Sequence, residues 1–287
     1  LLTAASLSAA FDYYTIPNSI EYGAMATRVD QTGETTFVAY AHPFRLKLAK
    51  FQLGTFFPES ATMENVSPYN ISITTNPQGA VLITFISNGD FYFFAFGNGI
   101  TGGCWQSGGL GVCGTVPLPD GMISTGPSWI RGGIDSSNRL HFVYAYRNQG
   151  TLTLFNGLYY RSRSSTGEWT ASNRIYGPAG ASLLNHVPNT VHVSNSSPAT
   201  LYFTSADGNA SYVGSSSGLP GNPVWTVETV SGSGVAYSAS DPKMAPDVLC
   251  EVTNAVPAEI RVRQRNPVTG VWGRPTKIAN ATPSVSS

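Results

Sequence analysis

The sequence predicts an all-β fold, because one apolar–turn–apolar pattern occurs five times along its 287 residues. In each copy an alternating apolar run enters a short polar turn and a second apolar run leaves it, as in WIRGGIDSSNRLHFVYAY. Period-two alternation around a turn is typical of a β-hairpin, and no segment shows a sustained helical stripe. The copies begin about 46 to 60 residues apart, within the period range of propeller blades, and cover 24–41, 70–87, 129–146, 189–206 and 247–265.

Each copy continues into further strand-like segments. A third apolar run follows the hairpin at 45–53, 91–98, 157–164 and 210–217. The later copies add a Gly-containing turn, a tryptophan and a last run at 168–177, 224–232 and 271–280. Four antiparallel strands per unit, repeated in series, is the architecture of a β-propeller. We therefore expect a single β-propeller domain over 1–287 with five four-stranded blades, at roughly 19–65, 66–122, 123–182, 183–232 and 233–287.

The fifth copy leaves the closure of the ring open. Its text EIRVRQRNPVTGVW resembles the third-strand text of the third copy as well as a second strand. If a strand is missing there, the run FDYYTIPN at 11–18 could supply it and close the ring; the alternative is an N-terminal arm packed on the rim. Six blades is the alternative to five if 231–241 contains a weak unit.

Composition limits the classes of function. Sixteen basic and sixteen acidic residues balance, and charged residues make up only 11% of the chain. Nucleic-acid surfaces and electrostatic membrane patches need a basic excess, so we expect neither partner. No apolar run approaches the roughly 18 residues that span a bilayer. Since the chain begins LLTAASLSAA rather than with Met, we expect that a signal or pro-segment has been removed and that the protein is secreted.

Cysteines and glycosylation sequons agree with an extracellular location. Cys104 and Cys113 flank the Gly-rich segment WQSGGLGV, which can bend back on itself, so we expect a disulfide between them, with two buried free thiols as the alternative. Cys250 lies in an apolar alternating run and is expected in the core. Among the Asn-x-Ser/Thr sequons, the favoured glycosylation sites are Asn65, Asn70 and Asn209.

Several turns resemble those of the sialidase-like β-propellers, whose blades carry the Asp-box or BNR repeat Ser-x-Asp-x-Gly-x-x-Trp. The matching stretches are RSRSSTGEWT, RQRNPVTGVWGRP and, more loosely, SGLPGNPVWT and TGGCW, with the Asp missing or shifted in each. The resemblance implies a propeller in which this box is a folding turn. It does not imply sialidase activity, because the nearest match to the family's first arginine motif, HPFRLK at 42–47, follows the first hairpin instead of preceding it.

Tryptophans at the ends of the blades and nearby arginines are the candidate ligand-binding residues. Indole rings stack on the apolar faces of sugars while neighbouring polar groups bind hydroxyls. Arg131, set in WIRGGID, lies among small residues on an expected inner strand, where a ligand can come close. The alternatives are tryptophans that pack between blades and a channel lined with paired side chains. The full set is Trp105, Trp169, Trp225, Trp272, Arg131, Arg161, Arg163 and Arg263.

We expect a non-catalytic, lectin-like role in binding glycans or polysaccharides, multivalent if several blades carry equivalent sites. One alternative is a glycoside hydrolase or polysaccharide lyase with an axial active site, for which His141, Arg131 and Tyr144 resemble a lyase set. The other is a structural extracellular glycoprotein that self-assembles. The sequence contains no phosphate loop, metal-ligand cluster or nucleophile elbow, so no cofactor or metal is expected and no catalytic residue is assigned.

Overall fold

The computed structural model describes residues 23–30, 33–52, 55–100, 111–119, 127–147, 155–177, 183–194, 196, 198–231, 234–240 and 247–281. Within these segments the chain forms β-strands joined by turns and contains no α-helix. Accordingly, these segments include no helix with the length and hydropathy needed to span a bilayer. Nor do three His, Cys, Asp or Glu side chains of the described segments gather as a metal-binding group.

The strands form five antiparallel sheets of four strands each, and in every sheet the strands pair in chain order. The first sheet contains β1 (Gly23–Asp30), β2 (Gly33–His42), β3 (Arg45–Gln52) and β4 (Thr55–Glu64), and the second contains β5 (Tyr69–Thr75), β6 (Val81–Ser87), β7 (Asp90–Phe96) and β8 (Val112–Thr115). The third contains β9 (Pro127–Ile134), β10 (Leu140–Tyr146), β11 (Gly157–Arg163) and β12 (Asn173–Ile175). The fourth contains β13 (Val187–Val193), β14 (Leu201–Ala206), β15 (Ser211–Ser217) and β16 (Val224–Ser231). The fifth contains β17 (Val235–Ser240), β18 (Val248–Thr253), β19 (Ala258–Gln264) and β20 (Thr276–Ala281).

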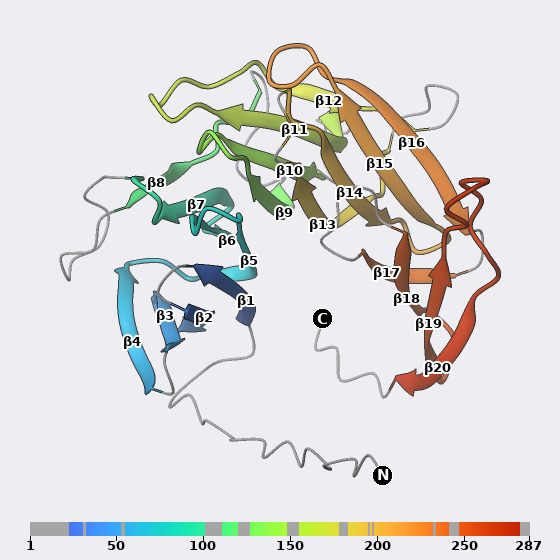
Figure 1. Ribbon diagram of the computed structural model, residues 1–287, viewed down its shortest axis with the longest axis horizontal. Helices are drawn as coiled ribbons and strands as arrows, with labels where there is room; N and C mark the ends of the chain where they lie inside the picture. Colours follow the sequence, from blue (N-terminus) through green and yellow to red (C-terminus); the bar gives the residue numbers. More distant parts are fainter. Residues whose placement is uncertain are drawn as a thin grey trace, which may run out of the picture.

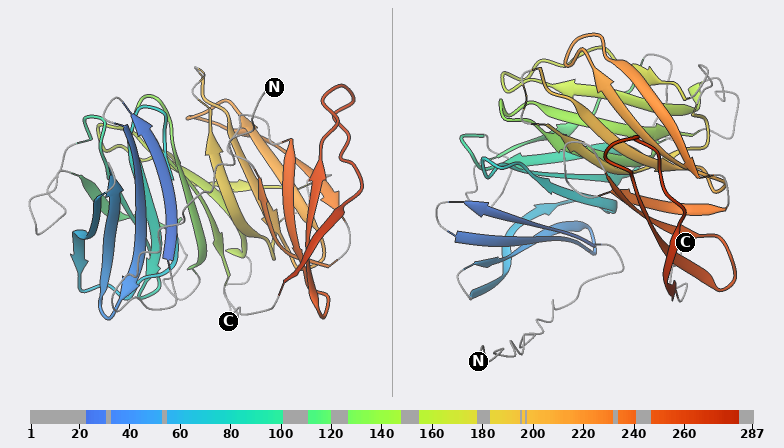
Figure 2. Two further views of the ribbon diagram at one scale, coloured as in Figure 1. Left: turned by 60° about the horizontal axis from the view of Figure 1, so that its bottom comes forward. Right: turned by 45° about the vertical axis from the view of Figure 1, so that its right-hand side comes forward.

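The sheets follow one another around a common centre, with the first strand of each sheet innermost (Figure 1). Neighbouring inner strands contact in the order β1, β5, β9, β13 and β17. In Figure 2 the strands of all five sheets run roughly along one common direction. The fold is a β-propeller of four-stranded blades, which confirms the predicted fold class and the count of five.

Apolar seams hold the first four sheets together. β6 and β10 are buried along their whole length, because each lies in a sheet packed on both faces. Alternate residues of such a strand therefore enter two different cores, which is why VLITFIS and LHFVYAY read as continuous apolar runs. In the seam between the second and third sheets, Phe93 meets Phe142 with ring centroids 5.3 Å apart. The equivalent seams on either side are also filled by aliphatic and aromatic side chains.

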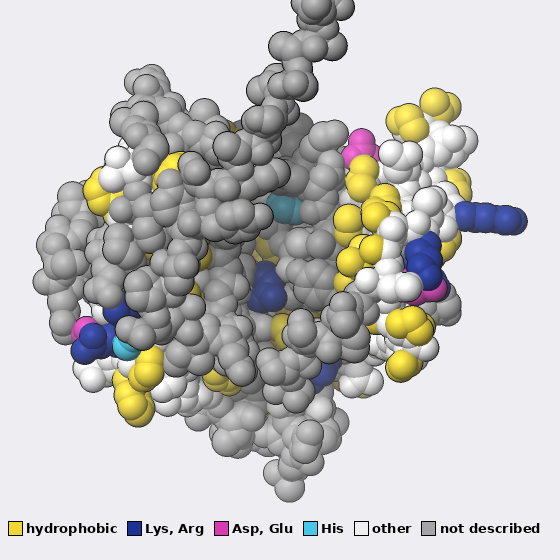
Figure 3. Space-filling view, turned by 90° about the horizontal axis from the view of Figure 1, so that it is seen from below, with side chains coloured by type: hydrophobic (Ala, Val, Ile, Leu, Met, Phe, Trp, Pro, Cys, Tyr) yellow, Lys and Arg dark blue, Asp and Glu magenta, His cyan; other side chains and the backbone are white. Residues whose placement is uncertain are grey.

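The seam between the fourth and fifth sheets contains a buried charge pair. The carboxylate of Glu251 is fully buried, accepts a hydrogen bond from Arg263 Nε at 2.9 Å, and accepts another from Ser211 Oγ of β15. Large exposed hydrophobic residues concentrate in the fifth sheet and its turns, and Figure 3 shows yellow side chains gathered at its right-hand side, where this sheet lies. These residues are Val256, Val268, Val271 and Ile278. The fifth sheet is thus held by ionic and hydrogen-bonding contacts more than the others.

The fifth copy was assigned the wrong strands from sequence. Its hairpin at 247–265 forms β18 and β19, the second and third strands, and not an inner hairpin. The inner strand is β17, which comes from the 231–241 segment that could have held a sixth unit. Cys250, expected in the core, is exposed because it lies on the face of β18 opposite Leu249 and Glu251, which are buried toward the fourth sheet. The run 11–18, the possible closing strand, lies outside the described residues.

Removing the cation from the Glu251–Arg263 pair is predicted to destabilise the protein strongly. Arg263→Met leaves a buried carboxylate with no counter-charge, so the free energy of unfolding should fall by about 3 kcal/mol or more. Arg261→Met, two residues away on β19, breaks the more exposed Arg261–Glu259 pair and should reduce the free energy of unfolding much less. Urea unfolding of the two variants measures both values. Equal losses in the two variants would contradict the role of the buried pair.

Candidate functional site

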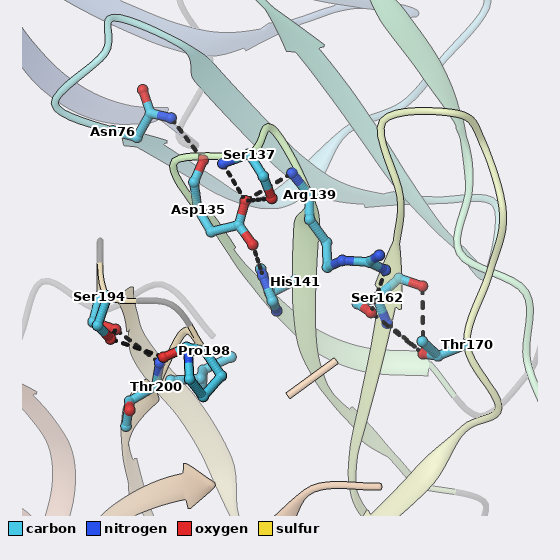
Figure 4. Close-up of polar contacts among 12 residues, drawn as sticks. Asn76, Asp135, Ser137, Arg139, His141, Ser162, Thr170, Ser194, Pro198 and Thr200 are labelled. Carbon is cyan, nitrogen blue, oxygen red and sulfur yellow. Dashed lines mark hydrogen bonds and ion pairs between the residues drawn. The ribbon is translucent and has the colours of Figure 1, made fainter. Parts of the chain in front are cut away.

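The turn between β9 and β10 is held by several hydrogen bonds to one carboxylate oxygen. Asp135 Oδ1 accepts hydrogen bonds from the backbone N of Ser137 at 2.8 Å, from Ser137 Oγ at 2.7 Å and from the backbone N of Arg139 at 2.9 Å (Figure 4). Asn138 adopts the left-handed conformation, with φ 62°. Asp and Asn are the residues that support such turns, because their side chains bond the backbone locally and tolerate a positive φ. The turn is therefore rigid.

Alternation along the start of β10 directs neighbouring residues into different seams. Asn138 and Leu140 line a hollow shared with the second sheet, whereas Arg139 and His141 line a hollow shared with the fourth. The first measures about 100 Å³ and is called the small hollow; the second measures about 400 Å³ and is called the large hollow. One turn thus contributes to two neighbouring hollows.

The large hollow has a polar wall and an apolar wall. Asp135, Ser136, Ser137, Arg139 and His141 of the third sheet form the polar wall. Across from them lie the turns of the fourth sheet that follow β13 and β15, and Figure 4 shows the first of these turns facing the Asp135–His141 segment. Its volume lies within the range of small-molecule sites. The fourth-sheet lining residues are Ser196, Pro198, Ala199, Leu219 and Pro220.

A buried chain of hydrogen bonds supports the polar wall. His141 is fully buried, with Nε2 3.1 Å from Asp135 Oδ2 and Nδ1 2.9 Å from the hydroxyl of Tyr160. Burial lowers the pKa of His141, although the bond to Asp135 acts in the opposite direction. Burial also acts to raise the pKa of Asp135, but the bonds from His141, Ser137 and the backbone of Arg139 outweigh it and lower that pKa to about 2. At neutral pH a neutral imidazole therefore donates to an ionised carboxylate, and the Tyr160 hydroxyl donates to the imidazole.

Arg139 presents hydrogen-bond donors to the large hollow. Among the described residues, its guanidinium makes one long contact, from Nη1 to Ser162 Oγ at 3.5 Å. Both oxygens of Asp135, in contrast, already accept bonds from the protein. Arg139 was not among the residues selected from sequence. The signal that could have found it is the period-two alternation of β10, which predicts that residues 139 and 141 share a face.

The predicted tryptophans Trp169 and Trp225 lie in the seams. The Trp169 ring packs 5.8 Å from Phe93 and 5.6 Å from Phe142, between the second and third sheets. Trp225 packs against β11 and β14 and donates Nε1 to Asn173 Oδ1 at 2.7 Å. Both side chains are partly buried, so they fill seams and present only part of each ring to solvent. Trp105 lies outside the described residues.

Trp272 has an arginine over its ring, as Trp169 does: Arg265 lies 5.7 Å from the Trp272 ring and Arg161 lies 5.6 Å from the Trp169 ring. Among the described residues, the buried Nε1 of Trp272 has no hydrogen-bond partner. Of the predicted arginines, Arg161 donates to the carbonyl of Pro117 at 2.8 Å, and Arg263 is paired with Glu251 as above. Arg163 is the one that lines a hollow, the small one.

Arg131 ties together the inner strands of three sheets. From β9, its Nε donates to the carbonyl of Asn189 on β13 at 3.0 Å, and its Nη1 donates to Asn70 Oδ1 on β5 at 2.8 Å. The same Asn70 oxygen accepts a bond from the backbone N of Ile130 at 3.1 Å. The two glycines after Arg131 admit side chains of neighbouring sheets, since a Cβ at Gly132 would lie 2.5 Å from Leu82. The small residues around Arg131 thus serve packing at the hub.

The predicted modification sites are only partly described. Cys113 lies on β8, but Cys104 lies outside the described residues, so the Cys104–Cys113 disulfide stays a prediction. Asn65 and Asn209 are exposed, whereas Asn70 is half-buried and its side-chain oxygen is bonded at the hub. Glycosylation at these three positions stays a prediction.

No family model and no curated protein matches this chain. Solved structures are similar in fold. A triple arginine-to-alanine mutant of AofleA from Arthrobotrys oligospora is 13% identical, covers 93% of this chain and 74% of its own, and has a TM-score of 0.53. A mutant of Aleuria aurantia lectin in complex with alpha-methyl-L-fucoside is 12% identical, with coverages of 92% and 79% and a TM-score of 0.53. The GH93 alpha-L-arabinofuranosidase of Fusarium graminearum with arabinobiose is 14% identical, with coverages of 89% and 81% and a TM-score of 0.52.

The buried histidines predict a fall in stability on mild acidification. Burial lowers the pKa of His141, and burial lowers that of His186 to about 4. The unfolded chain then binds more protons than the folded one, so each histidine should reduce the free energy of unfolding by up to about 1.4 kcal/mol per pH unit below about pH 6.5. Urea unfolding between pH 7 and 5 measures this slope. It should flatten in the double variant His141→Gln/His186→Gln, and a flat wild-type profile would contradict the prediction.

Proposed function

We propose that this protein is a secreted, non-catalytic, lectin-like carbohydrate-binding β-propeller whose glycan site is the large hollow between the third and fourth sheets. The observation that carries the proposal is the composition of the two walls. Hydroxyl and guanidinium groups on one side suit the hydroxyls of a sugar, and the apolar side chains of Pro198, Leu219 and Pro220 on the other suit its C–H faces. The volume of about 400 Å³ accommodates a sugar ring.

Rigidity of the polar wall supports binding. The bonds of Asp135 to Ser137, Arg139 and His141 hold the turn in place before any ligand arrives. A pre-formed site loses less conformational entropy on binding, so more of the contact energy appears as affinity. Arg139 then supplies charge-assisted donors to sugar oxygens.

The structural neighbours agree with a carbohydrate ligand, since one was solved with a fucoside and another with arabinobiose. Binding is favoured over hydrolysis by the composition of the inner strands. Glycosidases of the usual kind need two carboxylates flanking the scissile bond. β5, β9, β13 and β17 contain no Asp or Glu and β1 contains Asp30 alone, so the five inner strands offer no such pair to an axial pocket.

The turns before Trp169 and Trp272 support kinship with the Asp-box repeat. Ser164 Oγ accepts from the backbone N of Glu168 at 3.0 Å, and Asn266 Oδ1 accepts from the backbone N of Val268 at 2.8 Å. Each turn then has a glycine with positive φ two residues before the tryptophan, at 101° and 70°. We infer that Ser and Asn replace the capping Asp in degenerate copies of that box.

Glycan binding should depend on Arg139. On a glycan array, wild-type protein is expected to bind a defined set of glycans, and Arg139→Ala should weaken the affinity for them by at least roughly tenfold, because a charge-assisted bond is lost. Titration calorimetry on the best array ligand measures the change. Arg45→Ala is the matched control, since Arg45 pairs with Glu64 on the first sheet, away from the hollow.

A second variant tests the hollow by volume. Ala199→Phe should fill part of the large hollow and block binding while leaving Arg139 unchanged. Circular dichroism melting of both variants checks that each is folded. An array on which wild-type protein binds nothing would overturn the proposed function, and full binding by both variants would overturn the proposed site.

A further inference from the structure

We propose that the small hollow between the second and third sheets is an anion subsite, and that the glycan recognised by this protein carries a carboxylate or sulfate group held there by Arg163. This inference rests on the proposed function, because it names the chemical class of the glycan. In this proposal the acidic group of the glycan binds in the small hollow, and a sugar ring binds in the large hollow.

Arg163 lies at the end of β11 and faces the second sheet. Its register partner on β10 is Leu140, which lines the same hollow, and its guanidinium lies 5.7 Å from the ring centroid of Phe93. The remaining lining residues are Gly99, Ile100, Val112, Asn138 and Ser165. The hollow therefore contains one cation and no carboxylate.

The guanidinium of Arg163 has no hydrogen bond or ion pair among the residues that the structure describes. Burial lowers the pKa of Arg163, which shows that the cation is partly removed from water without a compensating charge. Asn138 also lines the hollow, but its amide nitrogen Nδ2 already donates to the carbonyl of Asn98 at 2.9 Å, so Arg163 is the donor proposed for an anion. A partly desolvated cation without a partner favours binding of an anion, and arginine binds carboxylate and sulfate oxygens through two parallel N–H groups.

In the fifth sheet, a carboxylate occupies the equivalent position. Arg163 forms a β-bridge with Trp169, and Arg265 forms the corresponding bridge with Trp272. In the fifth sheet, Arg265 Nη2 binds the carboxylate of Glu228, which comes from the preceding sheet, at 3.1 Å. At Arg163 in the third sheet, the second sheet provides the Phe93 ring and the small hollow in place of a carboxylate. We infer that a ligand supplies at Arg163 the acidic group that Glu228 supplies at Arg265.

The small hollow is too small for the role proposed for the large one. About 100 Å³ holds a carboxylate or sulfate group but not a whole sugar ring. The β9–β10 turn divides the two hollows, and its residues Ser136 and Ser137 are exposed. A glycan that crosses this turn can place a ring in the large hollow and the acidic group of a neighbouring ring in the small one.

The test compares glycans that differ only in charge. The probes are a uronic-acid oligosaccharide, its methyl ester, and an oligosaccharide of equal length that carries sulfate groups and no uronic acid. Each is titrated by calorimetry. Wild-type protein should bind the acid roughly tenfold more tightly than the ester, as expected for one charge-assisted pair. In Arg163→Gln this ratio should fall to about one while the affinity for the ester is unchanged. Comparing the acid with the sulfated probe identifies which anion is preferred.

Each outcome decides between the two proposals. Equal affinity for acid and ester in the wild type, or a ratio that persists in Arg163→Gln, overturns the anion subsite and leaves the proposed function standing. Failure of every glycan to bind overturns the proposed function. The subsite is then judged by titration with inorganic sulfate, which should shift the Nε–H resonance of Arg163 in the nuclear magnetic resonance spectrum; no shift overturns it. Arg163→Gln should melt at the wild-type temperature because Arg163 has no ion-pair partner among the described residues, and Arg45→Gln is the charge-matched control.

Discussion

Packing of one sheet face against the next is the constraint on which this molecule depends. A four-stranded sheet with two apolar faces cannot remain in water, so each sheet needs a neighbour on both sides. The second and third sheets meet this need most fully, as the complete burial of β6 and β10 shows. Because packing in the seams fixes the strands, it also fixes the turns that join those strands at the rims of the sheets. The hollows beside the β9–β10 turn follow from that geometry.

The sequence was sufficient to predict the repeated unit but not its register everywhere. Hairpins with strong apolar runs, such as WIRGGID with LHFVYAY, were placed correctly because both strands carry large apolar residues. β17, with sequence VAYSAS, consists mainly of small residues and gave a weak signal. The stronger alternation of β18 and β19 was therefore interpreted as an inner hairpin. The similarity of that text to a third strand was the correct indication.

The candidate site was harder to predict for a physical reason. The walls of the large hollow come from turns about 60 and 80 residues apart in sequence, and no local motif joins Arg139 to Pro198 or Leu219. The recurring tryptophans were predicted to bind ligand, but large aromatic rings at equivalent positions also fill the seams between sheets. In the structure Asp135 supports the β9–β10 turn, and the side chain of His141 is hydrogen-bonded to it. Arg163 was selected for its place beside Trp169, although its lack of an ion-pair partner among the described residues could only be seen in three dimensions.

The seam between the fourth and fifth sheets has a consequence for how the molecule opens. Hydrophobic seams bury no charge, whereas the junction that contains Glu251, Arg263 and Ser211 buries a charge pair that is stable only while both partners stay together and bonded. Structural units of lower local stability separate first during partial unfolding. The C-terminal sheet is therefore the unit expected to exchange its amide protons earliest, while the four sheets before it, and the turns they hold in place, keep their native order.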